Sequence, residues 1–224
     1  MAYLNAEEAG HALRVIGEKL QAADILTVEG AAALRDESFR LAKLKKETSW
    51  TTRIARERAI TFERVQDKDG AEISIALSAE RIVIDQDVVS HPPFVTLDVA
   101  VAITNAAGEP VCRWHLDRAN IGQQGPLFHL QMGGHLPGFR DRELPIAEPR
   151  WCHPPLELGL LCEVLAANFF PAKWARSVRD DPAWCDAIRR LQKLCFTDYV
   201  ARLTQSLAVS ESTALARMWN GSWV

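Results

Sequence analysis

Several features that would assign a protein class at once are missing from this sequence. No apolar run approaches the length of a membrane span, and the N-terminus carries Glu7 and Glu8 where a secretory signal needs a basic start and an apolar stretch. With 48% hydrophobic and 25% charged residues among 224, the chain is also neither disordered nor collagen-like in composition. We therefore expect a cytoplasmic protein without a membrane partner.

The cysteines form no disulfide framework or metal motif that the sequence reveals. They are odd in number, and no two have the two-residue gap of a zinc knuckle or a thioredoxin-like redox motif. The five are Cys112, Cys152, Cys162, Cys185 and Cys195. We predict that they are small buried apolar residues.

Motifs of the common enzyme classes are missing as well. The sequence has no glycine-rich phosphate loop, no dinucleotide fingerprint, no His-Glu-x-x-His and no Gly-x-Ser-x-Gly elbow. These absences argue against nucleotide-driven and serine-hydrolase chemistry. The sequence predicts no cofactor and no assigned metal.

Charge is balanced over the whole chain but not within it. The 26 basic and 29 acidic residues give a net charge of −3, whereas residues 40 to 64 carry eight basic side chains against three acids. Trp50 and Phe62 lie in that segment, so it can form a nucleic-acid surface that combines stacking with phosphate contacts. The candidate residues are Lys43, Lys45, Lys46 and Arg53. The alternative is a solvated junction between a helix and a strand.

Helical periodicity marks both ends of the chain. Asn5 is a candidate N-cap for a helix of about five turns, because apolar residues then recur at helical spacing. A second helix is predicted over about residues 28 to 46. Residues 156 to 170 are apolar almost all round, as in a helix buried on most sides, and Pro171 is predicted to end it.

The last helices have capping signals of their own. Asp181 before Pro182 is typical of a helix start, and the helix is predicted to run to about Leu207. Ser210 is predicted to cap a short final helix ending at residues 220 to 221.

Between these helices, the periodicity is that of strands joined by short turns. Six are predicted, over about residues 56 to 65, 71 to 78, 80 to 86, 94 to 104, 110 to 117 and 126 to 132. In the fourth, an apolar face alternates with one that carries Thr96, Asp98 and Ala100. Short loops and clean alternation favour an antiparallel sheet with one face covered.

These elements predict a single α+β domain over residues 1 to 224, in which a mostly antiparallel meander sheet of about six strands is flanked by N-terminal and C-terminal helices. Residues 1 to 50 are expected to be helical, 54 to 132 to form the sheet and 156 to 220 to be helical. A proline-rich loop over residues 133 to 155 connects the last two parts. Loops of this length are uncommon unless they cover something.

The most suggestive spacing lies on the last two predicted strands. Arg113, His115 and Asp117 share one face of the first, and His129 and Gln131 share one face of the second. If the strands pair, the two imidazoles and the carboxylate can bind zinc or share acid–base work. The alternative is the polar face of a sheet, in which each histidine is hydrogen-bonded singly.

The ends of the proline-rich loop hold further candidates. His153 stands before Pro154-Pro155, and Glu157 follows in the first turn of the apolar helix. With His129 and His135 they can form a cleft where a strand meets a helix. The alternative is structural: Glu157 complements the helix dipole and His153 anchors a turn.

Tryptophan is frequent, with seven residues, five of them at or after Trp151. Because aromatic residues are enriched at interfaces, we interpret four of these tryptophans as partner-binding candidates. They are Trp174, Trp184, Trp219 and Trp223. The alternative is that they belong to an ordinary helical core.

Two main hypotheses follow. The first is an interaction or regulatory module that is not an enzyme and that binds a protein partner, or a second copy, through its aromatic C-terminal helices. It predicts that replacing Trp219 or Trp223 by Ala weakens association more than folding. The second is a hydrolase of the phosphodiesterase or nuclease type that uses His115, His129, His153 and Glu157, with or without a metal ion. Nucleic-acid binding through residues 40 to 64 is a third, weaker hypothesis.

Overall fold

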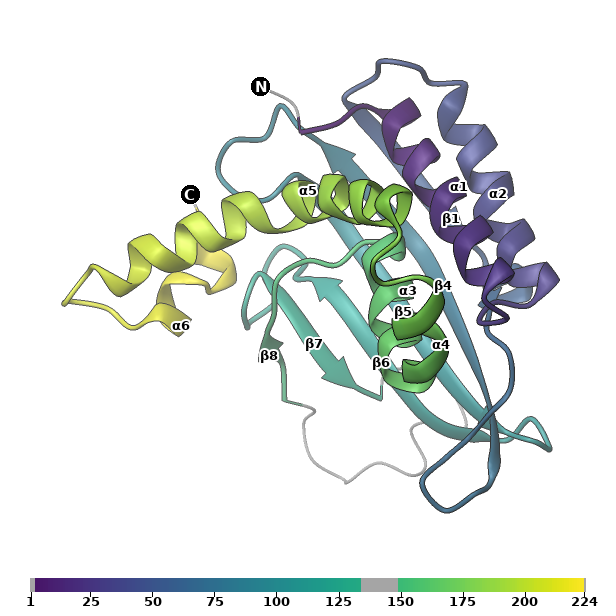
Figure 1. Ribbon diagram of the computed structural model, residues 1–224. Coiled ribbons are helices and arrows are strands. Elements are labelled where there is room, and N and C mark those ends of the chain that lie inside the picture. Colours follow the sequence, from purple (N-terminus) through teal and green to yellow (C-terminus); the bar gives the residue numbers. More distant parts are fainter. Residues whose placement is uncertain (1–2, 134–148, 224) are drawn as a thin grey trace.

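Eight antiparallel strands form one sheet, and helices precede and follow it in the chain, which confirms the α+β class (Figure 1). The computed structural model describes residues 3–133 and 149–223. The spatial order is β1-β4-β5-β6-β7-β8, and the short β2 and β3 also pair with β4. The strands are β1 (Ser49–Ile54), β2 (Ile60–Thr61), β3 (Val65–Gln66), β4 (Glu72–Asp85), β5 (Phe94–Asn105), β6 (Pro110–Arg118), β7 (Phe128–Met132) and β8 (Trp151–Cys152).

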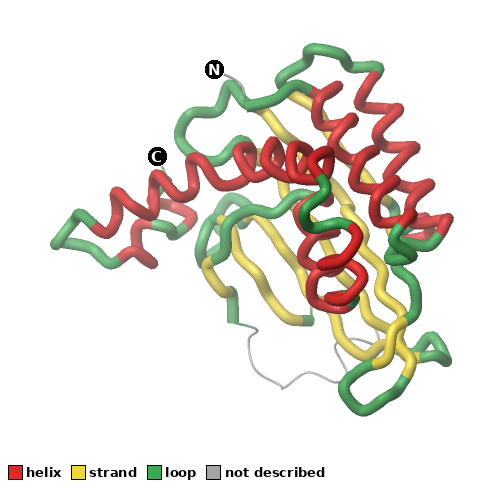
Figure 2. Tube along the Cα trace, in the orientation of Figure 1, coloured by secondary structure: helices red, strands yellow, loops and turns green. Residues whose placement is uncertain are grey.

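The helices gather on one side of this sheet, as Figure 2 shows. They are α1 (Ala6–Ala22), α2 (Val28–Ala42), α3 (Leu158–Phe169), α4 (Pro171–Ser177), α5 (Pro182–Leu207) and α6 (Ala214–Arg217). Single 3-10 turns occur at Arg56–Arg58 and Asn220–Ser222. Within residues 3–133 and 149–223, none of the helices combines the length and the apolar character needed to cross a bilayer.

Capping explains where the two best-predicted helices begin. The Asn5 side chain accepts a hydrogen bond from the Glu8 backbone N–H, and the Glu8 carboxylate accepts one from the Asn5 N–H, so α1 starts with a complete capping box. The Asp181 carboxylate caps α5, and Pro182 occupies its first position. Both starts confirm the sequence prediction.

Strand β4 corrects the prediction of separate strands over residues 71 to 78 and 80 to 86. It is a single strand with a β-bulge, because Ala79 pairs with Val99 of β5 whereas Arg81 pairs with the preceding Asp98. The bulge changes which residues face the core, from Ala79 on one side of it to Ile82 on the other. That change in alternation resembles a turn when only the sequence is read.

Several other boundaries also differ from the prediction. The expected strand over residues 56 to 65 is a 3-10 turn followed by the two short strands β2 and β3, while β1 and β8 were not predicted. The helix expected over residues 28 to 46 ends at Ala42. Pro171 does end α3, but it also begins α4. Thr213, not Ser210, caps the last helix.

The core lies between the helices and the apolar face of the sheet. On β4 and β5 the buried side chains alternate along the strands, as in Ile75 and Leu77 opposite Ile103 and Val101. Fully buried residues of the helices, such as Ile16 and Leu158, belong to the same core cluster. The opposite face of the sheet therefore carries the polar residues of each strand.

The cysteine prediction holds only in part. All five thiols are free, and Cys162 and Cys195 are buried in the core as expected. Cys152 and Cys185 are exposed instead, and Cys112 is half-buried. Cys152 lies in the edge strand β8, where its Sγ is 3.1 Å from the Tyr199 hydroxyl, and Cys185 lies near the start of α5.

Candidate functional site

Strands β5, β6 and β7 bring their polar residues together on the sheet face that is turned away from the helices. In the observed register, Asp98 of β5 is directly opposite Asp117 of β6, and Asp117 is directly opposite His129 of β7. His115 is opposite Gln131 in the same β6–β7 pair, which makes the two histidines diagonal neighbours. The predicted pairing of these strands is therefore present, in the register that puts both histidines on one face.

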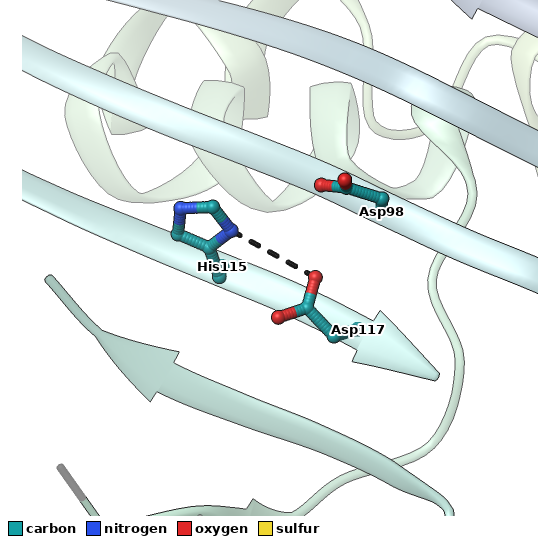
Figure 3. Close-up of side chains that lie close together, drawn as sticks. All are labelled: Asp98, His115 and Asp117. Atoms are coloured by element: carbon teal, nitrogen blue, oxygen red, sulfur yellow. Dashed lines mark ion pairs between the residues drawn. The ribbon is translucent and has the colours of Figure 1, made fainter. Parts of the chain in front are cut away.

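Three of these side chains converge closely enough to act as one group (Figure 3). One ligand atom each from Asp98, His115 and Asp117 lies within 4.8 Å of the others. Within the group, His115 Nδ1 and Asp117 Oδ1 are 3.7 Å apart. The side chains of His115 and Asp117 are 11% and 22% exposed, so both are largely buried.

The electrostatic environment of Asp98 is unfavourable for its negative charge. Burial, followed by repulsion from the Asp117 carboxylate, raises the pKa of Asp98, and Glu80 adds to the effect. His115 and Arg113 act in the opposite direction. The positive groups near Asp98 therefore only partly offset its repulsion from Asp117.

His129 stands beside this cluster in a defined protonation state. Its Nδ1 lies 3.1 Å from the carbonyl oxygen of Pro126, which can only accept a hydrogen bond, so Nδ1 carries the proton. Burial lowers the pKa of His129, which keeps the ring neutral near pH 7. The residue is 2% exposed, and its Nε2, which holds the lone pair, is buried and has no hydrogen-bond partner in the described part of the chain.

His153 lies on the other side of the sheet from His115 and His129. It lines an apolar cavity of about 480 Å³ between α3 and the strands β6 and β7. The strand residues that line this cavity, Trp114, Leu116 and Leu130 among them, alternate with the residues of the polar cluster. The cavity and the cluster therefore occupy opposite faces of the same strands.

Glu157 is likewise remote from the cluster. Its side chain is the N-cap of α3 and accepts a hydrogen bond of 2.8 Å from the Leu160 N–H. The residue is 6% exposed, and burial raises its pKa to about 7. The buried thiols of Cys162 and Cys195 in the helical layer are titratable neighbours of Glu157.

The four residues of the hydrolase hypothesis are thus not brought to a single place. His115 belongs to the polar cluster and His129 lies beside it, whereas His153 lines the cavity and Glu157 caps α3. His135 lies outside the described residues. Sequence reasoning missed Asp98 as a site residue, although its place on the polar face of its strand was the available signal.

The basic candidates form no continuous positive surface. Lys43, Lys45 and Lys46 are exposed in the turn after α2. Arg53 borders a cleft of about 330 Å³ that is also lined by two acids, Asp36 and Glu37. Its guanidinium group lies 3.5 Å from Glu80, while the other two arginines of the cleft pair with Glu37 and Asp36. Nucleic-acid binding here stays a prediction.

The four tryptophan candidates differ in how much of each side chain a partner can reach. Trp184 and Trp223 belong to the core of the chain itself and are 1% and 5% exposed. Trp174 packs on the outside of that core, and Trp219 is half-buried. For Trp184 and Trp223 the structure therefore favours the alternative of an ordinary core.

Comparison with known proteins adds no further residue to this site. No protein-family model, no curated protein and no solved structure matches the chain.

Proposed function

We propose that the chain is a hydrolase of the phosphodiesterase type, with its reaction centre at Asp98, His115, Asp117 and His129. The observation that carries the proposal is the convergence of Asp98, His115 and Asp117 within 4.8 Å on the face that also bears His129. Carboxylates and imidazoles at this spacing are the groups that position and activate water.

Within this centre, His129 is the general base. Its Nδ1 proton is held by the Pro126 carbonyl, so the lone pair on Nε2 can take a proton from an attacking water. The water oxygen then forms a bond to phosphorus, the bond from phosphorus to the leaving alcohol breaks, and that alcohol takes up a proton. Arg113, on the same face of β6, adds positive charge beside the anionic ester.

A direct test is hydrolysis of bis(p-nitrophenyl) phosphate and of a labelled oligonucleotide by the purified chain, assayed with EDTA and with Mn²⁺. His129→Gln is expected to reduce kcat by about 100-fold or more. His11→Gln is the matched control, because His11 is exposed on α1. No turnover of either ester by the wild type, or equal turnover by His129→Gln, contradicts the proposal.

Association through the C-terminal helices is the second candidate function. The C-terminal half of α5, together with α6, projects beyond the sheet (Figure 1). Three aliphatic side chains of this projecting part, Val200, Leu207 and Leu215, are more than half exposed. A second copy of the chain can cover them, since exposed apolar groups favour contact between proteins.

The native mass measured by light scattering tests this candidate. A dimeric wild type that becomes monomeric in Leu207→Glu, but not in Val28→Glu, supports it. Val28 is the control because it is also an exposed aliphatic residue, at the start of α2. A monomeric wild type contradicts self-association.

A further inference from the structure

We propose that Asp98, His115 and Asp117 bind one divalent transition-metal ion, Mn²⁺ or Zn²⁺. The inference rests on the site of the proposed hydrolase and deepens it, because it names the ion that would activate the water. Metal binding itself can be measured without any turnover, so each proposal can fail separately.

The geometry is close to that of a metal site. Ligand atoms about 2.1 Å from one ion lie about 3 to 4.2 Å from each other, depending on the angle between them. The three ligand atoms here lie within 4.8 Å of one another, and His115 Nδ1 lies 3.7 Å from Asp117 Oδ1. Small rotations of the side chains therefore bring all three within reach of one ion.

The charges around Asp98 also favour the binding of a cation. Asp98 and Asp117 are direct cross-strand neighbours, and like charges in that position destabilise a sheet. Among the described residues, three groups besides His115 act on Asp98: the carboxylates of Asp117 and Glu80, and the Arg113 guanidinium. Within the described part of the chain, acids thus outnumber fixed positive charges around Asp98, and a divalent ion between the two aspartates would attract both carboxylates.

His129 gives an independent indication of a ligand at this place. Its Nε2 is buried, with no hydrogen-bond partner among residues 3–133 and 149–223, and the residue is 2% exposed and directly opposite Asp117. A buried acceptor without a partner lowers the stability of the folded chain. A water molecule on the proposed ion would supply the missing proton donor. This is also the water that His129 would deprotonate in the hydrolase.

The mixture of ligands selects the kind of ion. Two carboxylates alone suit Mg²⁺ or Ca²⁺, whereas an imidazole ligand favours the transition metals. We therefore expect Mn²⁺ to bind more tightly than Mg²⁺. Mn²⁺ is the better probe than Zn²⁺, because the exposed thiols of Cys152 and Cys185 can also bind zinc.

Titration calorimetry of the chelator-treated full chain with MnCl₂ is the experiment, with MgCl₂ for comparison. The wild type is expected to bind one Mn²⁺ per chain. Asp98→Asn and Asp117→Asn are each expected to weaken binding about tenfold or more, while Asp69→Asn leaves it unchanged. Asp69 is the matched control because it is exposed in the turn between β3 and β4.

Two further measurements separate the possible failures. Thermal melting with and without Mn²⁺ shows whether each variant is folded, and only chains that keep the site should gain thermal stability from the ion. His129→Gln is expected to keep the stoichiometry of one Mn²⁺ while losing turnover. Absence of saturable Mn²⁺ binding by the wild type, or equal binding by Asp98→Asn and Asp117→Asn, overturns the metal proposal. Metal binding without hydrolysis overturns only the proposed function.

Discussion

Asp98 and Asp117 face each other across the β5–β6 pair, so two carboxylates occupy a position where a stable sheet usually places opposite charges or neutral side chains. The β5–β6 register makes Asp98 and Asp117 direct neighbours, because both side chains lie on the polar face of the sheet. Repulsion across this pair is expected to lower the stability of the metal-free chain.

Replacing one of these carboxylates by its amide is expected to stabilise the metal-free protein. Asp98→Asn should raise the free energy of unfolding by about 0.2–1 kcal/mol, because it removes the repulsion between directly opposed like charges. Urea unfolding in the presence of EDTA at pH 8 measures the change. Asp69→Asn should leave the value unchanged, and a marked loss in Asp98→Asn would mean that the carboxylate is held by a favourable network instead.

Glu157 should make the stability of the protein depend on pH. Burial raises the pKa of Glu157 from 4.5 to about 7 in the folded chain, so its contribution is fully present below about pH 4.5 and is lost as the pH rises through 7. Glu157→Gln cannot ionise and should unfold at higher urea concentration than the wild type above pH 7. The expected difference is about 3 kcal/mol at most.

A pH series of urea unfolding curves from pH 4.5 to 8.5 distinguishes this cause from a simple loss of the helix cap. The advantage of Glu157→Gln should grow with pH and level off above 7. Glu211→Gln is the control, since Glu211 is exposed in the turn between α5 and α6. A difference between Glu157→Gln and wild type that stays constant with pH would show that the carboxyl does not titrate in this range.

The structure changes what is expected of Trp223. Its ring contacts those of Phe128 and Tyr199, with centroids 6.1 Å and 6.4 Å away, and its Nε1 donates to the Met218 carbonyl. Trp223→Ala should therefore destabilise folding by about 3–5 kcal/mol, rather than weaken association alone. Trp151→Ala, at a side chain that is 62% exposed, should change stability by less than about 0.5 kcal/mol. Thermal unfolding of both variants checks the contrast.

Local signals predicted the elements that they directly specify. Asn5 and Asp181 gave correct helix starts, because a capping side chain acts on backbone groups within three residues. The same local reasoning failed at Glu80, since a bulge is decided by pairing with β5 and changes the alternation in the way a turn would. The strand β8 was also missed, because a two-residue strand is too short to show a period.

The candidate site was only half predictable for a similar reason. Alternation alone put His115 and Asp117 on one face, and His129 and Gln131 on one face. It contained no information on the β5–β6 register, which is what brings Asp98 opposite Asp117. Conversely, His153 and Glu157 are near each other in the sequence and follow β7 in the chain, yet the sheet separates them from the cluster. Only the fold could show this separation.

Gly30 lies where α2 meets β2, and the two backbones are so close there that no side chain fits. A Cβ at Gly30 would lie 2.1 Å from the carbonyl oxygen of Thr61, and the Thr27 N–H already donates to that oxygen. Alanine normally stabilises a helix relative to glycine, by up to about 1 kcal/mol. Here the clash is with backbone, which cannot rotate away, so Gly30→Ala should instead lower the free energy of unfolding by about 1–3 kcal/mol.

Gly221→Ala is the matched control, since a Cβ there meets nothing within 4 Å. It should change the free energy of unfolding by less than about 0.5 kcal/mol. Urea unfolding of the two variants gives both values under the same conditions. If Gly30→Ala were as stable as the wild type, α2 would have to sit farther from β2 than the structure places it, and Thr27 would lose its hydrogen bonds to Thr61. In the wild type the Gly30 N–H donates to the Thr27 hydroxyl at the start of α2. The same displacement of α2 should therefore also appear as faster amide exchange at residue 30 of Gly30→Ala.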